Sequence, residues 1–135
     1  MTATTGRRPA ARGASNAAAP NMLGAMALEA SLSLLEEVGM VQVERALHER
    51  VQWLLDGLNQ MTGVRLLSAQ APDRRAGIVT FTADAWDNRQ LHERLKAEQI
   101  ICAQRGGGIR LSPHFYTEAR VIEHTLQRVR TILDE

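Results

Sequence analysis

The sequence predicts a small α/β (α+β) domain, with a four-strand sheet packed by helices in the order α-α-β-β-α-β-β-α. Three observations predict this fold class. The chain has 135 residues, enough for one hydrophobic core and too few for two domains. Its composition, 44% hydrophobic and 23% charged, is that of a globular protein. Segments with helical spacing of apolar residues alternate with short segments rich in β-branched residues.

Residues 1–19 differ in composition from the rest of the chain. They collect Gly, Pro, Ser, Thr and Ala and show no hydrophobic period. We therefore expect a disordered leader over 1–19 and a folded domain over 20–135. Pro20 suits the first turn of a helix.

Two helices are predicted to follow the leader. In the first, apolar residues recur at spacings of three and four from Leu23 to Val38, and Gly39 provides a stop. In the second, apolar residues from Val43 to Met61 fall on one face before Gly63 interrupts the pattern.

Strands and shorter helices make up the remainder. Residues 64–67 and 76–82 predict two strands, separated by a turn at 71–73. Asp87 or Asn88 can cap a third helix that runs to about Glu98. Residues 100–103 and 109–112 predict two more strands around the glycines at 106–108. Thr117 can cap a last helix, whose apolar face is formed by Ile122, Leu126, Val129 and Leu133.

Charge and cysteine content argue against several classes of function. Of the 16 basic residues three lie in the leader, so 13 remain in the domain against 15 acidic ones. That balance gives no basic face of the kind that neutralises phosphates, and we expect no nucleic-acid partner. No stretch approaches the length of about twenty apolar residues that spans a bilayer, so no membrane partner is expected. Cys102 is the only cysteine, which favours a reducing, cytoplasmic location.

The segment 105–116, RGGGIRLSPHFY, is the densest candidate for a functional site. On a strand over 109–112, Arg110 points opposite to Ile109 and Leu111, and we expect its guanidinium to be held at a sheet edge. A guanidinium can grip a carboxylate through two parallel hydrogen bonds. The alternative is that Arg110 pairs with a surface glutamate or is only solvated.

The same segment carries a resemblance to a known family. RGGGIRLSPHFY resembles the C-terminal signature of class V aminotransferase-like proteins, which include cysteine desulfurases, selenocysteine lyases and isopenicillin-epimerase-like enzymes. The stretch APNMLGAMALEASLSLLEEVGM is similar to the family's segment that begins Gly-Thr-Pro-Asn and runs into a long helix. GIVTF at 77–81 also fits.

This resemblance implies a fold and a site. The chain would be the small C-terminal domain, with its lead-in helix, of a fold-type-I enzyme that depends on pyridoxal 5'-phosphate. Arg110 would bind the α-carboxylate of an amino-acid substrate, and we expect Arg105, the other guanidinium of the segment, to bind substrate beside it. The partner would be the large cofactor-binding domain or a full-length homologue, and a homodimer is left open.

The sequence also departs from the family's pattern. The Schiff-base lysine belongs to the large domain, and the only lysine here, Lys96, reads as a solvated helix residue. We therefore expect no catalytic residue in this chain and no covalent bond to the cofactor. Ala18 and Ala19 stand where the family has Gly-Thr, and Thr117 stands where it has asparagine. Cys102 does not match the position of the sulfur-accepting cysteine and reads as a buried, inert thiol.

Other residues of the segment have structural explanations. The glycines at 106–108 are explained equally well by an anion-binding backbone nest or by a flexible connection between strands, and the connection is the commoner case. His114 reads as a structural histidine at a strand-to-helix junction. His48, His92 and His124 share no metal-ligand spacing.

Three functions remain open at this level. The chain is part of a transferase or lyase, contributing to transamination, desulfuration or epimerisation only beside a large domain. Alternatively, it is a non-catalytic binding or regulatory partner of a full-length relative, or a truncated remnant that exposes apolar surface.

Overall fold

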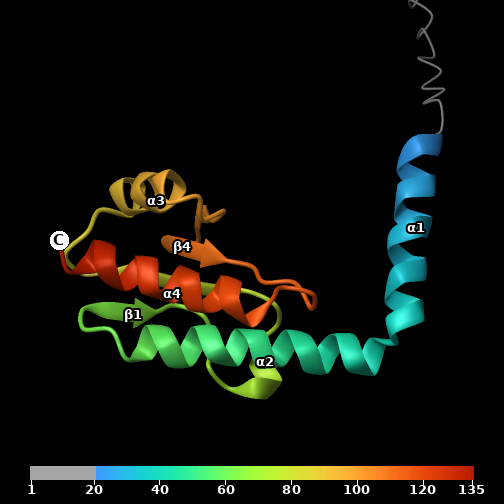
Figure 1. The fold of residues 1–135 in the computed structure, drawn as a ribbon, viewed down its shortest axis with the longest axis horizontal. Helices are drawn as coiled ribbons and strands as arrows, with labels where there is room; N and C mark the ends of the chain where they lie inside the picture. The colour runs from blue at the N-terminus through green and yellow to red at the C-terminus, as the bar shows by residue number, and fades with distance from the viewer. Residues whose placement is uncertain (1–20) are drawn as a thin grey trace, which may run out of the picture.

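A computed structural model describes residues 21–135, so the predicted leader and the role of Pro20 lie outside the described residues. The predicted order of elements is confirmed, with one 3-10 helix added between the first two strands (Figure 1). The elements are α1 (Met22–Val38), α2 (Met40–Asn59), β1 (Val64–Leu66), the 3-10 helix η1 (Pro72–Arg74), β2 (Val79–Ala83), α3 (Asn88–Ala97), β3 (Ala103–Arg105), β4 (Gly108–Leu111) and α4 (Ala119–Leu133).

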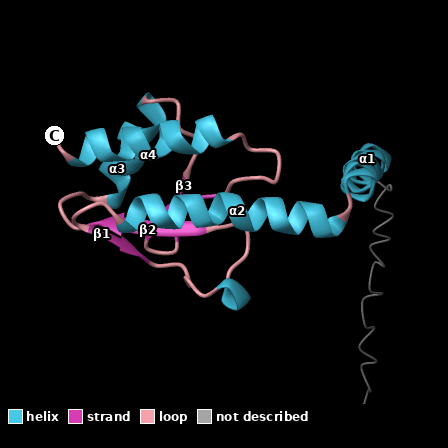
Figure 2. Ribbon diagram, turned by 60° about the horizontal axis from the view of Figure 1, so that its bottom comes forward, coloured by secondary structure: helices cyan, strands magenta, loops and turns pink. Residues whose placement is uncertain are grey.

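The four strands form one antiparallel sheet in the order β1-β2-β4-β3, which confirms the predicted four-strand sheet packed by helices. β2 shows the alternation of a sheet with one covered face: Val79, Phe81 and Ala83 are buried, while Thr80 and Thr82 are less so. The side chains on the covered face join residues of α2, α3 and α4 in one core. α2 and α4 lie side by side along the sheet (Figure 2).

The opposite face of the sheet, which we call the outer face, is covered by none of the α-helices among the described residues. By the two-residue alternation of strands it receives Thr80 and Thr82 from β2 and Arg110 from β4. Ile78 and Leu67, which flank the strands on this face, are each 43% exposed.

Some predicted boundaries are wrong, for local reasons. The strand predicted over 76–82 begins only at Val79, where pairing with β4 starts. Residues 100–102 are not a strand: Gln99 takes a positive φ of 62° at the end of α3, and pairing with β4 begins only at Ala103. Thr117 does not cap the last helix, whose N-cap is Glu118. The Thr117 hydroxyl instead accepts a hydrogen bond from the His114 N–H at 2.8 Å and closes the turn before the helix.

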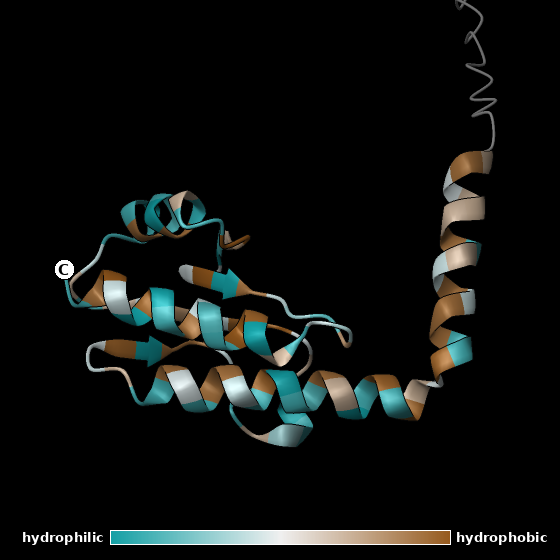
Figure 3. Cartoon of the chain, viewed as in Figure 1, coloured by the Kyte–Doolittle hydropathy of each residue, from teal (hydrophilic) through white to brown (hydrophobic). Residues whose placement is uncertain are grey.

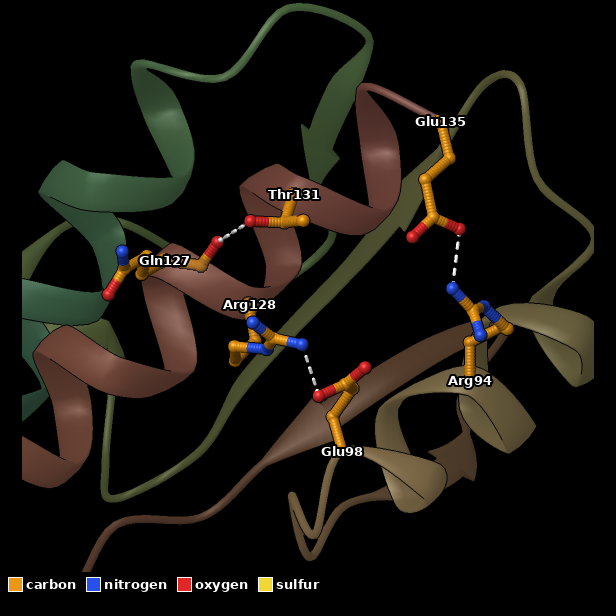
Figure 4. A network of polar contacts seen from close by, with 6 residues as sticks. All are labelled: Arg94, Glu98, Gln127, Arg128, Thr131 and Glu135. Carbon is orange, nitrogen blue, oxygen red and sulfur yellow. Dashed lines mark hydrogen bonds and ion pairs between the residues drawn. The ribbon is translucent and has the colours of Figure 1, made fainter.

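Two ion pairs tie α3 to α4 and to the end of the chain. The guanidinium of Arg128 on α4 pairs with Glu98 after α3, and Arg94 on α3 pairs with Glu135 (Figure 4). All four side chains are partly exposed, so each pair contributes modestly. They nevertheless show that two arginines of this domain form ion pairs with nearby carboxylates.

α1 stands away from the rest of the domain, joined to α2 at a sharp corner (Figure 1). The corner is Gly39, whose φ of 88° is in the region that favours glycine. Asn21 caps the first turn by accepting a hydrogen bond from the Gly24 N–H at 2.9 Å. No residue of α1 is buried, although the sequence places an apolar stripe along it.

Candidate functional site

Arg110 lies in the middle of the outer face. Its strand, β4, is paired on both sides, and Arg110 stands opposite Thr80 of β2 and Ala103 of β3. The expectation that this guanidinium sits at a sheet edge is therefore wrong, because β3 returns to pair with β4 as the outermost strand. The predicted orientation away from Ile109 and Leu111 agrees with the burial of both these side chains in the core.

The Arg110 guanidinium has no carboxylate partner among residues 21–135. It forms no ion pair and no hydrogen bond there, and its Nε is buried without an acceptor. The segment before residue 21 contains no aspartate or glutamate. Arg110 is therefore not paired with a surface glutamate among the described residues, which was the first alternative explanation of this residue. The Nε atoms of Arg75 and Arg128 are also buried without an acceptor, but both of those guanidiniums have a partner at a terminal nitrogen, which distinguishes Arg110 from them.

Two more arginines belong to the outer face. Arg105 at the end of β3 pairs with Gly108 and shares the face of Arg110, and it is exposed. Arg65 on β1 pairs with Thr82 and is also exposed. The structure thus places Arg105 and Arg65 on the same face as Arg110. The alternation of Arg65 with Val64 and Leu66 was the signal that could have identified it.

The three glycines before Arg110 have two different explanations. Gly106 and Gly107 have φ values of 65° and 82° and form the two-residue turn of the β3–β4 hairpin, a conformation suited to glycine. Gly108 is required by close packing: a Cβ on it would lie 2.3 Å from the backbone oxygen of Phe81. The segment is therefore a defined turn followed by a tight strand contact.

Asn88, the first residue of α3, holds this turn in place. Its Nδ2 donates to the Gly107 carbonyl oxygen at 2.8 Å, and its Oδ1 accepts from the Thr82 hydroxyl at 3.1 Å. One side chain therefore links a helix, β2 and the turn that leads into β4. Asp87 independently caps α3, as predicted, by accepting from the Arg89 and Gln90 N–H groups.

Replacing Asn88 with alanine is expected to lower the free energy of unfolding by about 1 kcal/mol, because two hydrogen bonds are lost from partly exposed groups. Amide hydrogen exchange at Gly107 and Gly108 should become faster. Gln90→Ala, on the exposed side of the same helix, is the matched control and should change neither quantity. Unchanged exchange at Gly107 and Gly108 in the Asn88 variant would show that the turn is stable without the hydrogen bonds of Asn88.

Cys102 is partly buried against the core but is not in a strand. Burial raises the pKa of its thiol, and the positive charge of Lys96 opposes this shift only in part. The thiolate is the reactive form of cysteine, so this environment disfavours nucleophilic sulfur chemistry. Its neighbour Ile101 was expected inside a strand and is instead 97% exposed.

The histidines show no catalytic constellation among the described residues. His114 is exposed, and its ring centroid lies 4.0 Å from that of Tyr116 in the turn before α4. His92 lies within hydrogen-bonding distance, 3.2 Å, of the Cys102 carbonyl oxygen. Within residues 21–135 no three His, Cys, Asp or Glu side chains are grouped so as to hold a metal ion.

Lys96 does not provide a site for pyridoxal phosphate. It borders an open hollow of about 310 Å³ together with Gln99, Ile100, Ile101 and Cys102. That hollow offers no second basic side chain for a phosphate and no acid for a pyridine nitrogen. Lys96 also lies on α3, which covers the face of the sheet opposite to Arg110. The residues around Lys96 therefore do not fit the cofactor.

Comparison with known proteins gives the family. The family model described as "Aminotransferase class-V" matches residues 10–123. The chain belongs to this family, as the resemblance of the 105–116 segment implied.

Individual relatives are cysteine desulfurases and a related lyase. A protein described as a probable cysteine desulfurase of Halalkalibacterium halodurans is 35% identical over 65 residues, which are 48% of this chain and 15% of that protein. The cysteine desulfurase of Thermococcus onnurineus NA1 superposes with a TM-score of 0.79 at 21% identity, over 85% of this chain and 32% of that one. The cystine C-S lyase C-DES superposes with a TM-score of 0.67 at 30% identity, over 75% and 27%.

The solved structures confirm the predicted fold-type-I small domain and the family's cofactor. In one C-DES structure a glycine is covalently linked to the pyridoxal-phosphate cofactor of that protein. The chain spans about a third or less of each of these relatives. Among residues 21–135, no helix combines the length and apolar character needed to cross a membrane.

Proposed function

We propose that this chain is the small domain of a class V enzyme and that Arg110 binds the α-carboxylate of an amino-acid substrate. The observation that carries the proposal is the guanidinium itself, which lies at the centre of the outer face with a buried Nε and no acceptor within the described residues. An anion that reaches this face would meet a rigid donor on an interior strand. Two charge-assisted hydrogen bonds would hold its carboxylate in a fixed orientation.

The surroundings of Arg110 favour an anion over a neutral ligand. Arg105 and Arg65 on the same face are exposed and add positive potential, which raises the local concentration of anions and speeds their approach. Arg105 would contact substrate at the rim of the site. Thr80 offers a hydroxyl on the neighbouring strand, opposite Arg110.

The covalent chemistry would be supplied from outside this chain. Pyridoxal phosphate held by the large domain would supply an electron sink for the reacting bonds. The role of the outer face is to orient the substrate against it, since a fixed carboxylate limits rotation of the bound molecule. The relatives named as a cysteine desulfurase and a cystine C-S lyase favour a sulfur-containing amino acid as substrate. Cys102 would take no part, because it lies on the helix-covered side.

The proposal is tested by expressing the chain with a tag in the organism that encodes it. A C-terminally tagged chain is purified, and absorbance is recorded before and after titration with cysteine. We expect the purified material to contain a class V large domain, in the same or a second polypeptide, with its bound cofactor, and cysteine to change the spectrum. The 135-residue chain alone, mixed with pyridoxal phosphate, should give only the spectrum of the free cofactor. Purified material without cofactor, or a specific band from the chain alone, would contradict the proposal.

The exposed apolar surface of α1 supports a second candidate function, a non-catalytic partner of a full-length relative. In that case a complete class V enzyme would co-purify with the tagged chain. Arg110→Ala would then leave the response of that complex to cysteine unchanged, whereas the first proposal predicts a weakened response.

A further inference from the structure

Arg105 and Arg110 stand close together on neighbouring strands of the outer face. β3 and β4 pair so that Arg105 lies opposite Gly108, and Ala103 lies opposite Arg110. The two arginines therefore occupy diagonal positions, whose Cβ atoms lie about 7–8 Å apart in an antiparallel pair. Figure 3 shows hydrophobic and hydrophilic positions alternating along β4. Both guanidiniums thus project from the same small area of the sheet.

The other two corners of this four-residue block are Ala103 and Gly108. Neither has a side-chain atom beyond Cβ, so neither fills the space between the two guanidiniums. Leu67 approaches from the β1 side, where its Cδ1 lies 3.0 Å from the position that a Cβ on Gly108 would take. A ligand over the block would therefore meet two cations with small residues between them and an apolar side chain at one margin.

The block carries positive charge that the described residues do not neutralise. Within residues 21–135, neither Arg105 nor Arg110 forms an ion pair. The outer-face positions of β3 and β4 also include no acidic residue. Arg65 differs from them, because Asp84 lies diagonal to it where the Asp84 N–H continues the pairing of β1 and β2 by donating to the Gly63 carbonyl oxygen at 2.9 Å.

A single carboxylate would leave part of this charge unbalanced. The planar fork of Arg110 takes up one carboxylate through two parallel hydrogen bonds, as proposed above. Arg105 would then remain without an anion. Once the large domain covers this face, an unpaired charge beside the substrate becomes costly, because water no longer solvates it fully. A second acidic group on the same ligand would remove that cost.

We infer that the substrate is an amino acid with a second acidic group on its side chain, which Arg105 binds while Arg110 holds the α-carboxylate. The inference rests on the proposed function and names its substrate class. The spacing of the two arginines is a property of the fold, because the turn at 106–107 and the Asn88 hydrogen bond to Gly107 hold β3 against β4. Arg105 therefore selects for the charge and the length of the substrate side chain.

Two ligands that differ only at the distal group test the inference. S-carboxymethylcysteine has a distal carboxylate, and S-carbamoylmethylcysteine has a neutral amide of the same shape. Absorbance titration of the complex of this chain with its large domain gives both dissociation constants. We expect the wild-type complex to prefer the carboxymethyl compound by about 5–10-fold, Arg105→Ala to abolish the preference and Arg105→Glu to reverse it. Equal wild-type affinities, or a preference that survives Arg105→Ala, would overturn the inference.

Control variants separate a local contact from general positive charge. Arg89→Ala removes an exposed arginine that pairs with Glu93 and should change neither constant. Arg65 is three strands from Arg105, about 14 Å, which exceeds the screening length of about 10 Å at 0.1 M salt. Arg65→Ala should therefore weaken both ligands by the same factor, below about threefold. A larger loss of preference in Arg65→Ala than in Arg105→Ala would also overturn the inference.

The two acid-binding roles can fail separately. If Arg110→Ala weakens both ligands while Arg105→Ala affects neither, the α-carboxylate proposal stands and the second contact is removed. If Arg105→Ala removes the preference while Arg110→Ala has no effect, the reverse holds. Equal weakening of both ligands by Arg105→Ala would mean that the two arginines share the α-carboxylate, which overturns the inference. Arg105 is exposed, so its replacement should leave the thermal unfolding of the chain unchanged.

Discussion

Replacing Gly108 with alanine is expected to lower the free energy of unfolding by about 1–3 kcal/mol, the range for overpacking a tight contact. The added Cβ would lie 2.3 Å from the Phe81 carbonyl oxygen, which belongs to the neighbouring strand and cannot swing aside as a side chain would. β2 and β4 are the two central strands, so relief of the clash must separate the middle of the sheet. Urea denaturation monitored by circular dichroism measures the change.

Gly77→Ala is the matched control for this prediction. A Cβ at Gly77 would also meet a neighbour closely, at 3.0 Å, but that neighbour is the end of the Leu47 side chain, which can move. We expect a change below about 1 kcal/mol, because only a flexible group must adjust. Equal free energies of unfolding for the two variants would show that the sheet tolerates a Cβ at position 108 and would contradict the prediction.

The second large effect is expected from Arg110→Ala in the complex of this chain with its large domain. Removal of two charge-assisted hydrogen bonds, at about 1.5 kcal/mol each, should weaken binding of cysteine by about 10²-fold. Arg110→Lys should recover part of this loss, since an ammonium keeps the charge without the planar fork. Spectroscopic titration of the complex gives both dissociation constants.

Controls separate a binding role of Arg110 from a structural one. Arg120→Ala removes an exposed arginine of α4 whose pKa is raised by its hydrogen bond and ion pair with Glu118, and it should leave cysteine binding unchanged. Added guanidinium ion should partly restore binding in Arg110→Ala, because it can occupy the vacated position. Wild-type affinity in Arg110→Ala would remove the residue from the site.

Local pattern was sufficient to predict most of the fold. The 3.6-residue period identified α2 and α4, and the two-residue alternation put Arg110 on the face opposite to Ile109 and Leu111. The order of strands is not local information, and so the prediction put Arg110 at an edge when β4 is interior. The apolar run at 100–102 misled because apolar composition does not show where strand pairing begins: β3 starts only at Ala103, and Ile101 is 97% exposed.

The site depended on contacts between distant segments. No spacing predicts that Gly108 approaches the Phe81 carbonyl or that Asn88 reaches Gly107, because α3 and the hairpin meet only in the folded domain. Periodicity likewise identified the apolar residues of α1 but not what lies against them. A stripe has the same sequence whether its own domain or another covers it.

The central claim is that Arg110 binds the carboxylate of an amino-acid substrate in the complex with the large domain. It is tested most directly by comparing the binding of cysteine with that of cysteamine, its analogue without the carboxylate, to complexes containing the wild-type chain or Arg110→Ala. The account predicts that the wild-type complex prefers cysteine by about 10²-fold, the value of two charge-assisted bonds, and that the variant loses most of this preference. A preference that survives unchanged in Arg110→Ala would contradict the account.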